Sequence, residues 1–359
     1  MQSLTKTLLQ IIGSPLLEAQ PDSKVIESKE LFDYAFKNNV EMLYVQRLEK
    51  SGKLIELQDT CRDIRERQQQ TLKTIHRLSS VLQAGNIPHA ITKTIRPYPG
   101  TPNDVDTLYL GDLAGYEAAA QYLLENNYKL TGPMDMQYEF FDVESGAGFD
   151  KFKTGGRFYI DFYRELAADH MPYMDSDVLA NEVEDHYIKG FEEPVKILSR
   201  RAEIVVLALH SVLMHRTIPL EVVYTYSFML AEMDNAEIDD LWMFAKHNHA
   251  EPSVRAVLAI IEKLYLECFD CVPAQLAYFV SIAGTSRKES RELVDTGLFM
   301  PHTALLWTFV ISVFSKIRGK RARRGFFKEL LHMLNPVFGV EVVYHMLSKR
   351  RIKDHSEHV

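Results

Sequence analysis

The hydrophobic pattern of the first 80 residues is helical. Apolar residues recur every three or four positions from Leu54 to Leu82, among many charged residues, and this spacing predicts one long amphipathic helix. A shorter helical pattern runs from Lys29 to Phe36, and the preceding Ser28 belongs to a residue type that caps helix N-termini. We therefore expect residues 1–80 to form an N-terminal helical region.

Between residues 81 and 172 the pattern changes to that of short strands. Runs of branched and aromatic residues alternate with turns rich in glycine and asparagine, and one helical stretch, Gly111 to Asn127, interrupts them. The predicted strands are Ala90–Thr92, Val105–Leu110, Lys129–Leu130, Tyr138–Phe141 and Phe158–Tyr163. This pattern predicts an α/β core in which one sheet is flanked by helices.

Helical periodicity returns from Asp175 onward, where we expect no further strands. The predicted helices are Glu203–His215, Leu220–Met233, Ile238–His249, Ser253–Phe269, Pro273–Ala283, His302–Ile317, Phe326–Leu334 and Val340–Leu347. Residues 173–359 are therefore predicted to form a C-terminal helical domain. The whole chain is predicted to be of the α+β class, with all-helical regions before and after the α/β core of residues 81–172.

The composition is that of an ordinary globular protein, since 46% of the 359 residues are hydrophobic and 25% are charged. No run approaches the roughly 18 consecutive apolar residues of a transmembrane helix, and the N-terminus lacks the pattern of a secretory signal. We expect a cytoplasmic protein with no membrane partner. The three cysteines, Cys61, Cys268 and Cys271, give no disulfide framework and no second pair for a zinc site, which favours helix-packing roles.

The charge is unevenly distributed. A formal net charge of −8 disfavours a general nucleic-acid binder, yet the segment from Lys316 to Lys328 contains seven basic residues and no acids. Such a local excess can hold RNA or polyphosphate through counterion release, and it is equally typical of a solvated loop between helices. Both interpretations of the basic segment stay open.

The clearest candidate chemistry lies between His89 and Leu110. Residues i and i+2 of a strand point to the same face, so Asp104 and Asp106 project together, about 6 to 7 Å apart. Like charges this close repel at neutral pH unless a cation bridges them. Asp161 stands alone in another strand-like run of aromatic and branched residues. If the two strands are neighbours, three carboxylates meet, and such an oxygen-rich set suits Mg²⁺ or Mn²⁺.

Ordinary structural roles could also explain several of these polar residues. An acidic pair at a strand end is also typical of a solvated turn, and Asp112 and Asp142 stand at element boundaries, where capping or turn formation explains them. Lys93 and Arg96 could contact phosphate groups, Lys93 through its ammonium charge and Arg96 through two parallel N–H groups of its planar guanidinium. Tyr98 could stack on a base or simply keep the shape of a proline-rich loop.

Several enzyme classes lack their signatures here. The sequence contains no Gly-x-Ser-x-Gly elbow, Walker loop or Rossmann glycine pattern, which disfavours hydrolase, P-loop kinase and dehydrogenase functions. His210 lies on an apolar helix face and is typical of a core histidine. His89 precedes the first predicted strand, where it could face the site or serve packing.

The order of these motifs resembles the polymerase-beta-type nucleotidyltransferase superfamily, in which Asp-x-Asp on one strand is followed by a helix and by a hydrophobic strand with a single Asp. Within it, the chain is most similar to the uncharacterised nucleotidyltransferase-like proteins of bacteria and archaea, over roughly residues 70–250. Ile91–Thr94 of this chain stands where the family has a Leu-Lys-Gly motif, and Asp104–Asp106 stands where the family has its metal-binding pair of acids. Asn127–Tyr128 corresponds to a Gly-Tyr motif of the family. Ile160–Tyr163 corresponds to the family's third strand, and Val206–His210 to a helical segment that contains a histidine.

The resemblance implies a small mixed sheet of the nucleotidyltransferase type and an enzyme that uses Mg²⁺ or Mn²⁺. Such an enzyme transfers a nucleoside monophosphate from a nucleoside triphosphate, such as ATP, to an acceptor hydroxyl on RNA, a protein or a small molecule. The residues implied to be catalytic and to hold the metal are Asp104, Asp106 and Asp161, of which Asp161 would also accept or orient the acceptor proton. The residues that we predict to bind the nucleotide are Lys93, Thr94 and Arg96.

One departure from the superfamily keeps other functions open. The superfamily usually carries a Gly-Ser or Gly-Gly pair before the acids, where backbone amides approach the triphosphate, whereas Thr92, Lys93 and Thr94 include no glycine. One alternative is therefore a binding or interaction module of the same fold with weak or no catalysis. Another is a toxin-like RNA nucleotidyltransferase, because relatives in this superfamily occur in toxin and antitoxin pairs.

Overall fold

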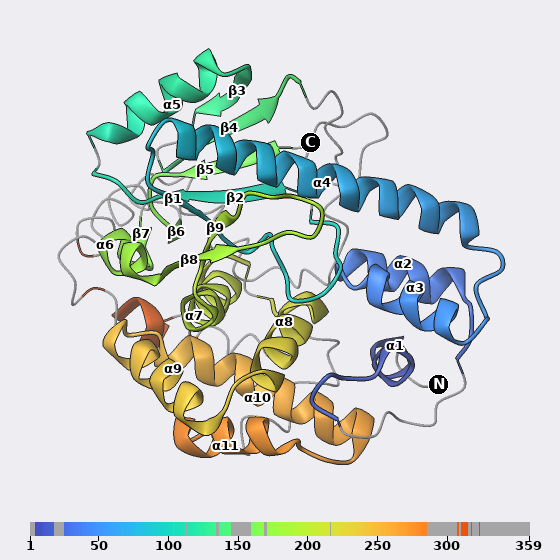
Figure 1. Cartoon of the computed structure of the whole chain (residues 1–359). Helices are drawn as coiled ribbons and strands as arrows, with labels where there is room; N and C mark the ends of the chain where they lie inside the picture. The colour runs from blue at the N-terminus through green and yellow to red at the C-terminus, as the bar shows by residue number, and fades with distance from the viewer. Residues whose placement is uncertain are drawn as a thin grey trace, which may run out of the picture. The chain divides into compact units, whose positions relative to one another are not determined.

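The computed structural model describes most of the chain up to residue 285 and a few residues beyond it (Figure 1). The described residues are 4–17, 25–102, 104–112, 114–133, 136–144, 159–168, 171–215, 217–285, 307–308, 310–314, 317 and 323. They fall into two compact units, each assembled from separate stretches of sequence. The helical unit comprises Met1–Thr71, Ile95–Pro102 and Arg200–Ser312, and the sheet unit comprises Leu72–Thr94, Asn103–Ser199 and Val313–Val359.

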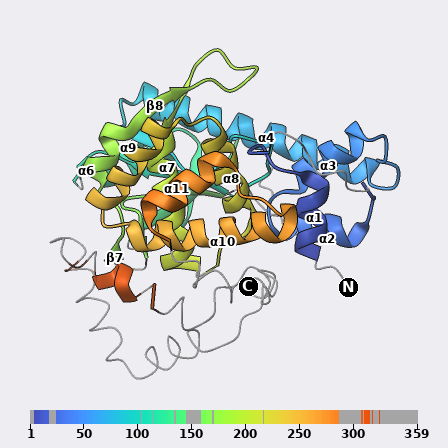
Figure 2. The same ribbon diagram turned by 90° about the horizontal axis from the view of Figure 1, so that it is seen from below.

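The helical unit is built from amphipathic helices that pack on one another, with α11 lying beside α10 (Figure 2). Its helices are α1 (Leu4–Ile12), α2 (Lys29–Lys37), α3 (Glu41–Lys50), the first part of α4 (Gln58–Ala84), α7 (Arg200–His210) with a π-helical turn (Ser211–His215), α8 (Leu220–Ala231), α9 (Asn235–His247), α10 (Glu251–Phe269) and α11 (Ala274–Ala283). The predicted cap of α2 is confirmed, because the Leu31 amide donates to Oγ of Ser28 at 3.4 Å.

The sheet unit contains a seven-stranded mixed sheet with the order β3-β4-β5-β2-β1-β9-β8 (Figure 1). Its strands are β1 (His89–Ile91), β2 (Asp104–Tyr109), β3 (Tyr128–Pro133), β4 (Gln137–Asp142), β5 (Tyr159–Tyr163), β8 (Val183–His186) and β9 (Val195–Leu198). The pairs β2–β5 and β1–β9 are parallel, and the other pairs are antiparallel. A small ribbon of β6 (Ala167–Ala168) and β7 (Met171–Pro172) precedes α6 (Ser176–Leu179) and a 3₁₀ turn (Ala180–Glu182).

Helices cover one face of this sheet. From the second part of α4, Oγ of Ser79 lies 3.1 Å from Nε2 of His89 in β1. From α5 (Gly115–Glu125), the ring of Tyr116 stacks on Phe162 of β5 with 5.3 Å between ring centroids. Because side chains alternate along a strand, Asp161, next to Phe162, points to the opposite face. We call that opposite side of β4, β5 and β2 the acidic face.

The expectation that strands end before residue 175 is wrong. β8 and β9 extend the sheet at one edge, and β9 pairs in parallel with β1. Each of these strands has only four residues, too few for an alternating pattern to stand out from a loop. Pairing with a neighbouring strand, which the sequence does not display, is what makes these segments extended.

Most helical predictions are confirmed where the structure describes the residues. The long helix predicted between Leu54 and Leu82 is α4, and the helices predicted between Glu203 and Ala283 are α7 to α11. The predicted helices 326–334 and 340–347 lie outside the described residues, as does the basic segment 316–328 apart from Ile317 and Arg323. The chain is thus a mixed α+β protein with one seven-stranded sheet and many helices.

The search of the described helices for a stretch that could cross a membrane finds none of sufficient length and hydrophobicity.

Candidate functional site

Three neighbouring strands place acidic residues side by side on the acidic face. Asp106 of β2 is paired with Asp161 of β5, and Asp161 is paired on its other side with Glu139 of β4. Asp104 lies two residues before Asp106 in β2 and therefore projects to the same face. The two aspartate-bearing strands are neighbours, which is the condition under which their carboxylates were expected to meet. Four carboxylates thus share one face of three strands.

The segment Thr92–Thr94 folds around the backbone of Asp106. The Thr92 amide donates to the Asp106 carbonyl oxygen at 3.0 Å, and the Asp106 amide donates to Oγ1 of Thr94 at 2.8 Å. Lys93 lies between these two contacts with a φ of 56°. That left-handed conformation costs a residue other than glycine about 1–2 kcal/mol and persists only where the surroundings impose it. The two threonines supply this restraint.

The ammonium group of Lys93 is held among the carboxylates. Its Nζ lies 3.1 Å from Oδ1 of Asp106, and the Lys93 side chain is only 6% exposed. The same Nζ lies 3.5 Å from the Tyr163 hydroxyl and 4.7 Å from the centroid of the Tyr163 ring. The Tyr163 hydroxyl in turn donates to Oδ2 of Asp161 at 3.2 Å. Lys93 is thereby linked to Asp106 directly and to Asp161 through one hydroxyl.

Burial and neighbouring charge shift the protonation of this cluster. Desolvation, followed by the negative charge of Asp106, raises the pKa of Asp161 to about 7 against the smaller opposing effect of Lys93. Burial is the largest single influence on the pKa of Lys93 and would by itself lower it, but the nearby negative charges, of which that of Asp106 is the strongest, together hold that pKa above its ordinary value. Lys93 is therefore charged near neutral pH, and Asp161 keeps its proton to a higher pH than an exposed aspartate does.

The acidic face fits a hard divalent cation by its chemistry. Carboxylate oxygens are the ligands that Mg²⁺ and Mn²⁺ prefer, and a cation would relieve the repulsion between Asp106 and Asp161. Across the parts of the chain that the structure describes, no three His, Cys, Asp or Glu side chains are gathered closely enough to hold a metal ion as they stand. Asp106 contacts Lys93 instead.

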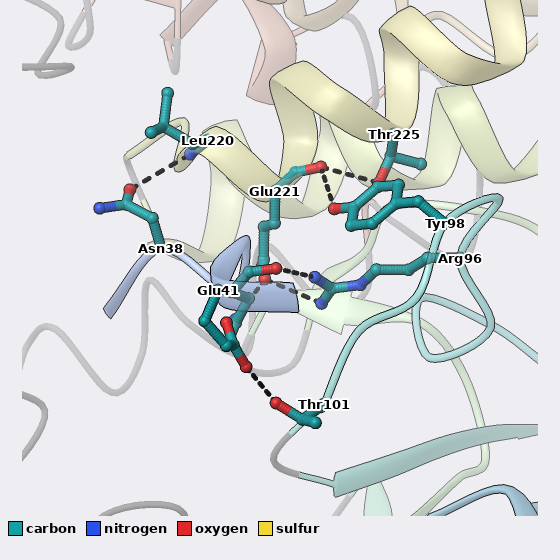
Figure 3. A network of polar contacts seen from close by, with 9 residues as sticks. Asn38, Glu41, Arg96, Tyr98, Thr101, Leu220, Glu221 and Thr225 are labelled. Atoms are coloured by element: carbon teal, nitrogen blue, oxygen red, sulfur yellow. Dashed lines mark hydrogen bonds and ion pairs between the residues drawn. The ribbon is translucent and has the colours of Figure 1, made fainter. Parts of the chain in front are cut away.

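Arg96, which was predicted to contact the nucleotide, belongs to the helical unit. Its Nη2 lies 2.8 Å from Oε2 of Glu221 in α8, and its Nη1 donates to the Asn39 carbonyl oxygen at 3.4 Å (Figure 3). The Arg96 side chain is buried, at 9% exposed. The structure thus places Lys93 and Thr94 in the sheet unit, with the acidic face, and Arg96 in the other unit.

Tyr98 and Thr101 are anchored in the same polar network (Figure 3). The Tyr98 hydroxyl donates to the Glu221 carbonyl oxygen at 3.1 Å, and its buried ring packs on Phe228 with 5.3 Å between centroids. The Thr101 hydroxyl donates to the Glu41 carboxylate. These contacts favour the shape-keeping role for this loop over a base-stacking role for Tyr98.

Other polar residues considered from the sequence have structural contacts. His89 is buried, with its Nδ1 2.8 Å from the Ile87 carbonyl oxygen, and burial lowers its pKa to about 4. The Asp142 side chain, 1% exposed, forms an ion pair with Arg77. Asp112 accepts a backbone hydrogen bond of 2.7 Å at the start of α5. Packing, ion pairing and capping account for these three residues.

Sequence reasoning missed two members of the cluster, Glu139 and Tyr163. Both stand in strands that were predicted, and both alternate with buried phenylalanines. A single carboxylate in an aromatic strand is the signal that selected Asp161, and it applies equally to Glu139. The register that puts Glu139 and Asp161 opposite each other has no such signal in one sequence.

Comparison of the sequence with models of known protein families gives no match, and comparison with curated proteins also gives none.

Proposed function

We propose that this chain is a metal-dependent nucleotidyltransferase that moves a nucleoside monophosphate from a nucleoside triphosphate to an acceptor hydroxyl. The observation that carries the proposal is the register of β2 and β5, in which Asp106 and Asp161 are direct partners on the acidic face and Asp104 projects to the same side. Paired carboxylates of this kind are the usual ligands of the metal ions in phosphoryl transfer. The acceptor class is RNA, a protein or a small molecule.

The backbone at two positions supports the proposal in spite of the missing glycine pair. Lys93 stands in the segment that resembles a Leu-Lys-Gly motif, and Asn127 stands at the position of a Gly-Tyr. Both have left-handed backbones, with φ of 56° and 66°. Glycine is the residue that adopts this conformation without cost. At these two positions the chain therefore has the backbone conformation that glycine adopts most readily.

The carboxylates and the nucleotide-binding residues have separate roles in the proposed reaction. Asp104, Asp106 and Asp161 would hold Mg²⁺ or Mn²⁺, which when bound neutralises charge on the phosphates and polarises them. Asp161 would accept the proton of the acceptor hydroxyl or orient that group. Lys93 would neutralise phosphate oxygens, and the Thr94 hydroxyl would add a second nucleotide contact.

The test is transfer of label from each α-labelled nucleoside triphosphate, with Mg²⁺ or Mn²⁺, into total RNA, the protein itself and a metabolite extract. Asp104→Asn is the informative variant, and Glu184→Gln, an exposed acid of β8 in the same sheet, is the matched control. We expect label to move with the native and control proteins and not with Asp104→Asn. Transfer that is equal in all three proteins, or absent from all three, would contradict the proposal.

A second candidate is a nucleotide-binding or interaction module with the same fold and little chemistry. It is favoured by the ion pair of Lys93 with Asp106, which leaves no ready group of three metal ligands among the described residues. This candidate predicts that triphosphate binding, measured by calorimetry, survives Asp104→Asn and that no label is transferred by the native protein. A toxin-like enzyme would instead arrest growth on expression, with relief by Asp106→Asn.

A further inference from the structure

The basic segment from Lys316 to Lys328 follows directly after an exposed phenylalanine. Phe314 belongs to the helical residues 310–314, and its side chain is 66% exposed. Whatever path the chain takes, the backbones of Lys316 and Arg318 lie within about 7 and about 14 Å of Phe314, because one residue spans at most about 3.6 Å. Positive charge is therefore close to this exposed ring.

A second aromatic ring is exposed seven residues earlier in the chain. Trp307 is exposed to the same extent, whereas the other tryptophan of the chain, Trp242, is buried. Among the described residues, no other tryptophan or phenylalanine is as exposed as these two rings. The sequence contains no acid between Asp295 and Glu329. The stretch Trp307–Lys328 thus combines two exposed rings and seven basic residues with no negative side chain.

Other side chains of the helical residues 310–314 are buried. Ser312 is fully buried, with its Oγ 3.1 Å from Oγ of Ser253 in α10, and Val313 is also buried. A helix that binds a lipid surface needs a broad apolar face, which such packing does not leave. Separate exposed rings beside cations instead match the way in which single-stranded nucleic acids are held. Their bases stack on aromatic side chains, and their phosphates pair with Lys and Arg.

The basic segment is richer in arginine than in lysine. Four of its seven basic residues are arginines, namely Arg318, Arg321, Arg323 and Arg324. Arginine binds a phosphate through two N–H groups and stacks its planar guanidinium on aromatic faces, which lysine does not. Arg323, which the structure describes, is exposed. A solvated loop would account for the charges but not for the exposed rings that precede them.

We infer that the stretch Trp307–Lys328 binds single-stranded RNA, with bases stacked on Trp307 and Phe314 and phosphates held by the basic residues. This binding requires neither the acidic face nor the transfer of a nucleotide. Stacking and charge are common to RNA and single-stranded DNA. The choice of RNA therefore rests on the proposed function, in which RNA is one of the acceptor classes.

The experiment is a titration of the protein into a fluorescein-labelled single-stranded RNA of mixed sequence, followed by fluorescence anisotropy. The variants are Phe314→Ala, Phe314→Leu and Phe314→Tyr, all at an exposed position. Tyr187→Ala is the matched control, because Tyr187 is an equally exposed aromatic residue that directly follows β8, a strand with two acids. Circular dichroism verifies that each protein is folded.

We expect Phe314→Ala and Phe314→Leu to weaken RNA binding about tenfold, because each removes a ring on which a base stacks. Phe314→Tyr, which keeps a ring, and Tyr187→Ala should bind as the native protein does. Arg321→Gln combined with Arg323→Gln should lower the slope of log affinity against log salt by about 1.4, since each phosphate contact with a single strand contributes about 0.7. Lys189→Gln, at an exposed lysine after β8, should leave the slope unchanged.

Tryptophan fluorescence gives a second readout. Trp307 is exposed and Trp242 is buried, so a base that stacks on Trp307 should quench the emission of the native protein. Trp307→Phe keeps a ring and leaves Trp242 as the only tryptophan. This variant should therefore bind RNA without quenching.

RNA affinity that is equal in the native protein, Phe314→Ala and Phe314→Leu, without quenching of Trp307, would overturn the stacking. Binding of inorganic polyphosphate, or of vesicles that contain an anionic phospholipid, as tight as that of RNA would overturn the assignment to nucleic acid. Tighter binding of single-stranded DNA would overturn the choice of RNA, and absence of binding would overturn the inference as a whole. Label transfer and its loss in Asp104→Asn are measured separately, so failure of RNA binding and failure of the proposed function are distinguishable.

Discussion

Asp161 is predicted to destabilise the folded protein at neutral and alkaline pH. Its pKa is raised from 3.8 to about 7, chiefly by burial and then by the charge of Asp106. Well below pH 3.8 the carboxyl group is protonated in both the folded and the unfolded chain, so it has no effect on stability. As the pH rises, the unfolded chain loses this proton first, and the folded state becomes less stable until the pH exceeds about 7.

The magnitude follows from the two pKa values. A difference of about three in pKa, at 1.36 kcal/mol for each, corresponds to roughly 4 kcal/mol. Asp161 is only partly buried, so solvent screening reduces this energy, and we expect roughly 2–3 kcal/mol at pH 8. Asp161→Asn removes the ionisation and keeps an acceptor for the Tyr163 hydroxyl, which donates to Asp161 at 3.2 Å. The variant should therefore be more stable than the native protein at pH 8, and the difference should shrink to about 0.5 kcal/mol near pH 4.

The assay is urea unfolding in the presence of EDTA at several values between pH 4 and pH 8. The quantity of interest is the difference in unfolding free energy between Asp161→Asn and the native protein, since effects of other groups cancel in it. Glu184→Gln, an exposed position of the same sheet, should show no such pH-dependent difference. A native protein that is as stable as Asp161→Asn at pH 8, or a difference that is largest at pH 4, would refute the reasoning.

Three further predictions concern stability. Arg77→Met should cost about 3 kcal/mol by leaving Asp142, 1% exposed, without its ion-pair partner, and adding Asp142→Asn should restore part of the loss in thermal unfolding. Arg96→Met should destabilise the helical unit by about 3 kcal/mol, because it leaves the Glu221 carboxylate without its ion-pair partner. Adding Glu221→Gln should restore stability. If triphosphate affinity, measured by calorimetry, stays low in this double variant, Arg96 also has the predicted phosphate role. Ser28→Ala should cost about 1 kcal/mol by removing the cap of α2, measured by urea unfolding, and an unchanged midpoint would contradict the capping role.

Helices, their caps and some strands could be predicted from the sequence because they depend on residues that are close together in the chain. The cap at Ser28, the long helix α4 and the helices from α7 to α11 follow from helical spacing and capping chemistry. Strand β5 follows from its branched and aromatic residues. The edge strands β8 and β9 were missed because four residues carry too little pattern, and their extended form depends on partners far away in the sequence.

Part of the acidic face could be predicted for the same reason. Spacing alone put Asp104 and Asp106 on one face, and composition singled out Asp161. The pairing of Asp161 with Glu139, and the contact of Lys93 with Asp106, depend on strand register and on a left-handed turn. Neither is encoded in a local pattern, since a shift of one residue in register would turn every side chain to the other face.

The stretch between β1 and β2 shows why nearness in sequence is a poor guide to shared function. Lys93 and Asp104, at its two ends, belong to the sheet unit, whereas residues 95–102 between them belong to the helical unit. The buried contacts of Arg96 and Tyr98 with Glu221 explain these residues without a ligand. On the acidic face, by contrast, four carboxylates of three strands share one side of the sheet, and Lys93, which forms an ion pair with Asp106, has a left-handed backbone. The search for chemistry therefore begins with Lys93, Asp106 and Asp161.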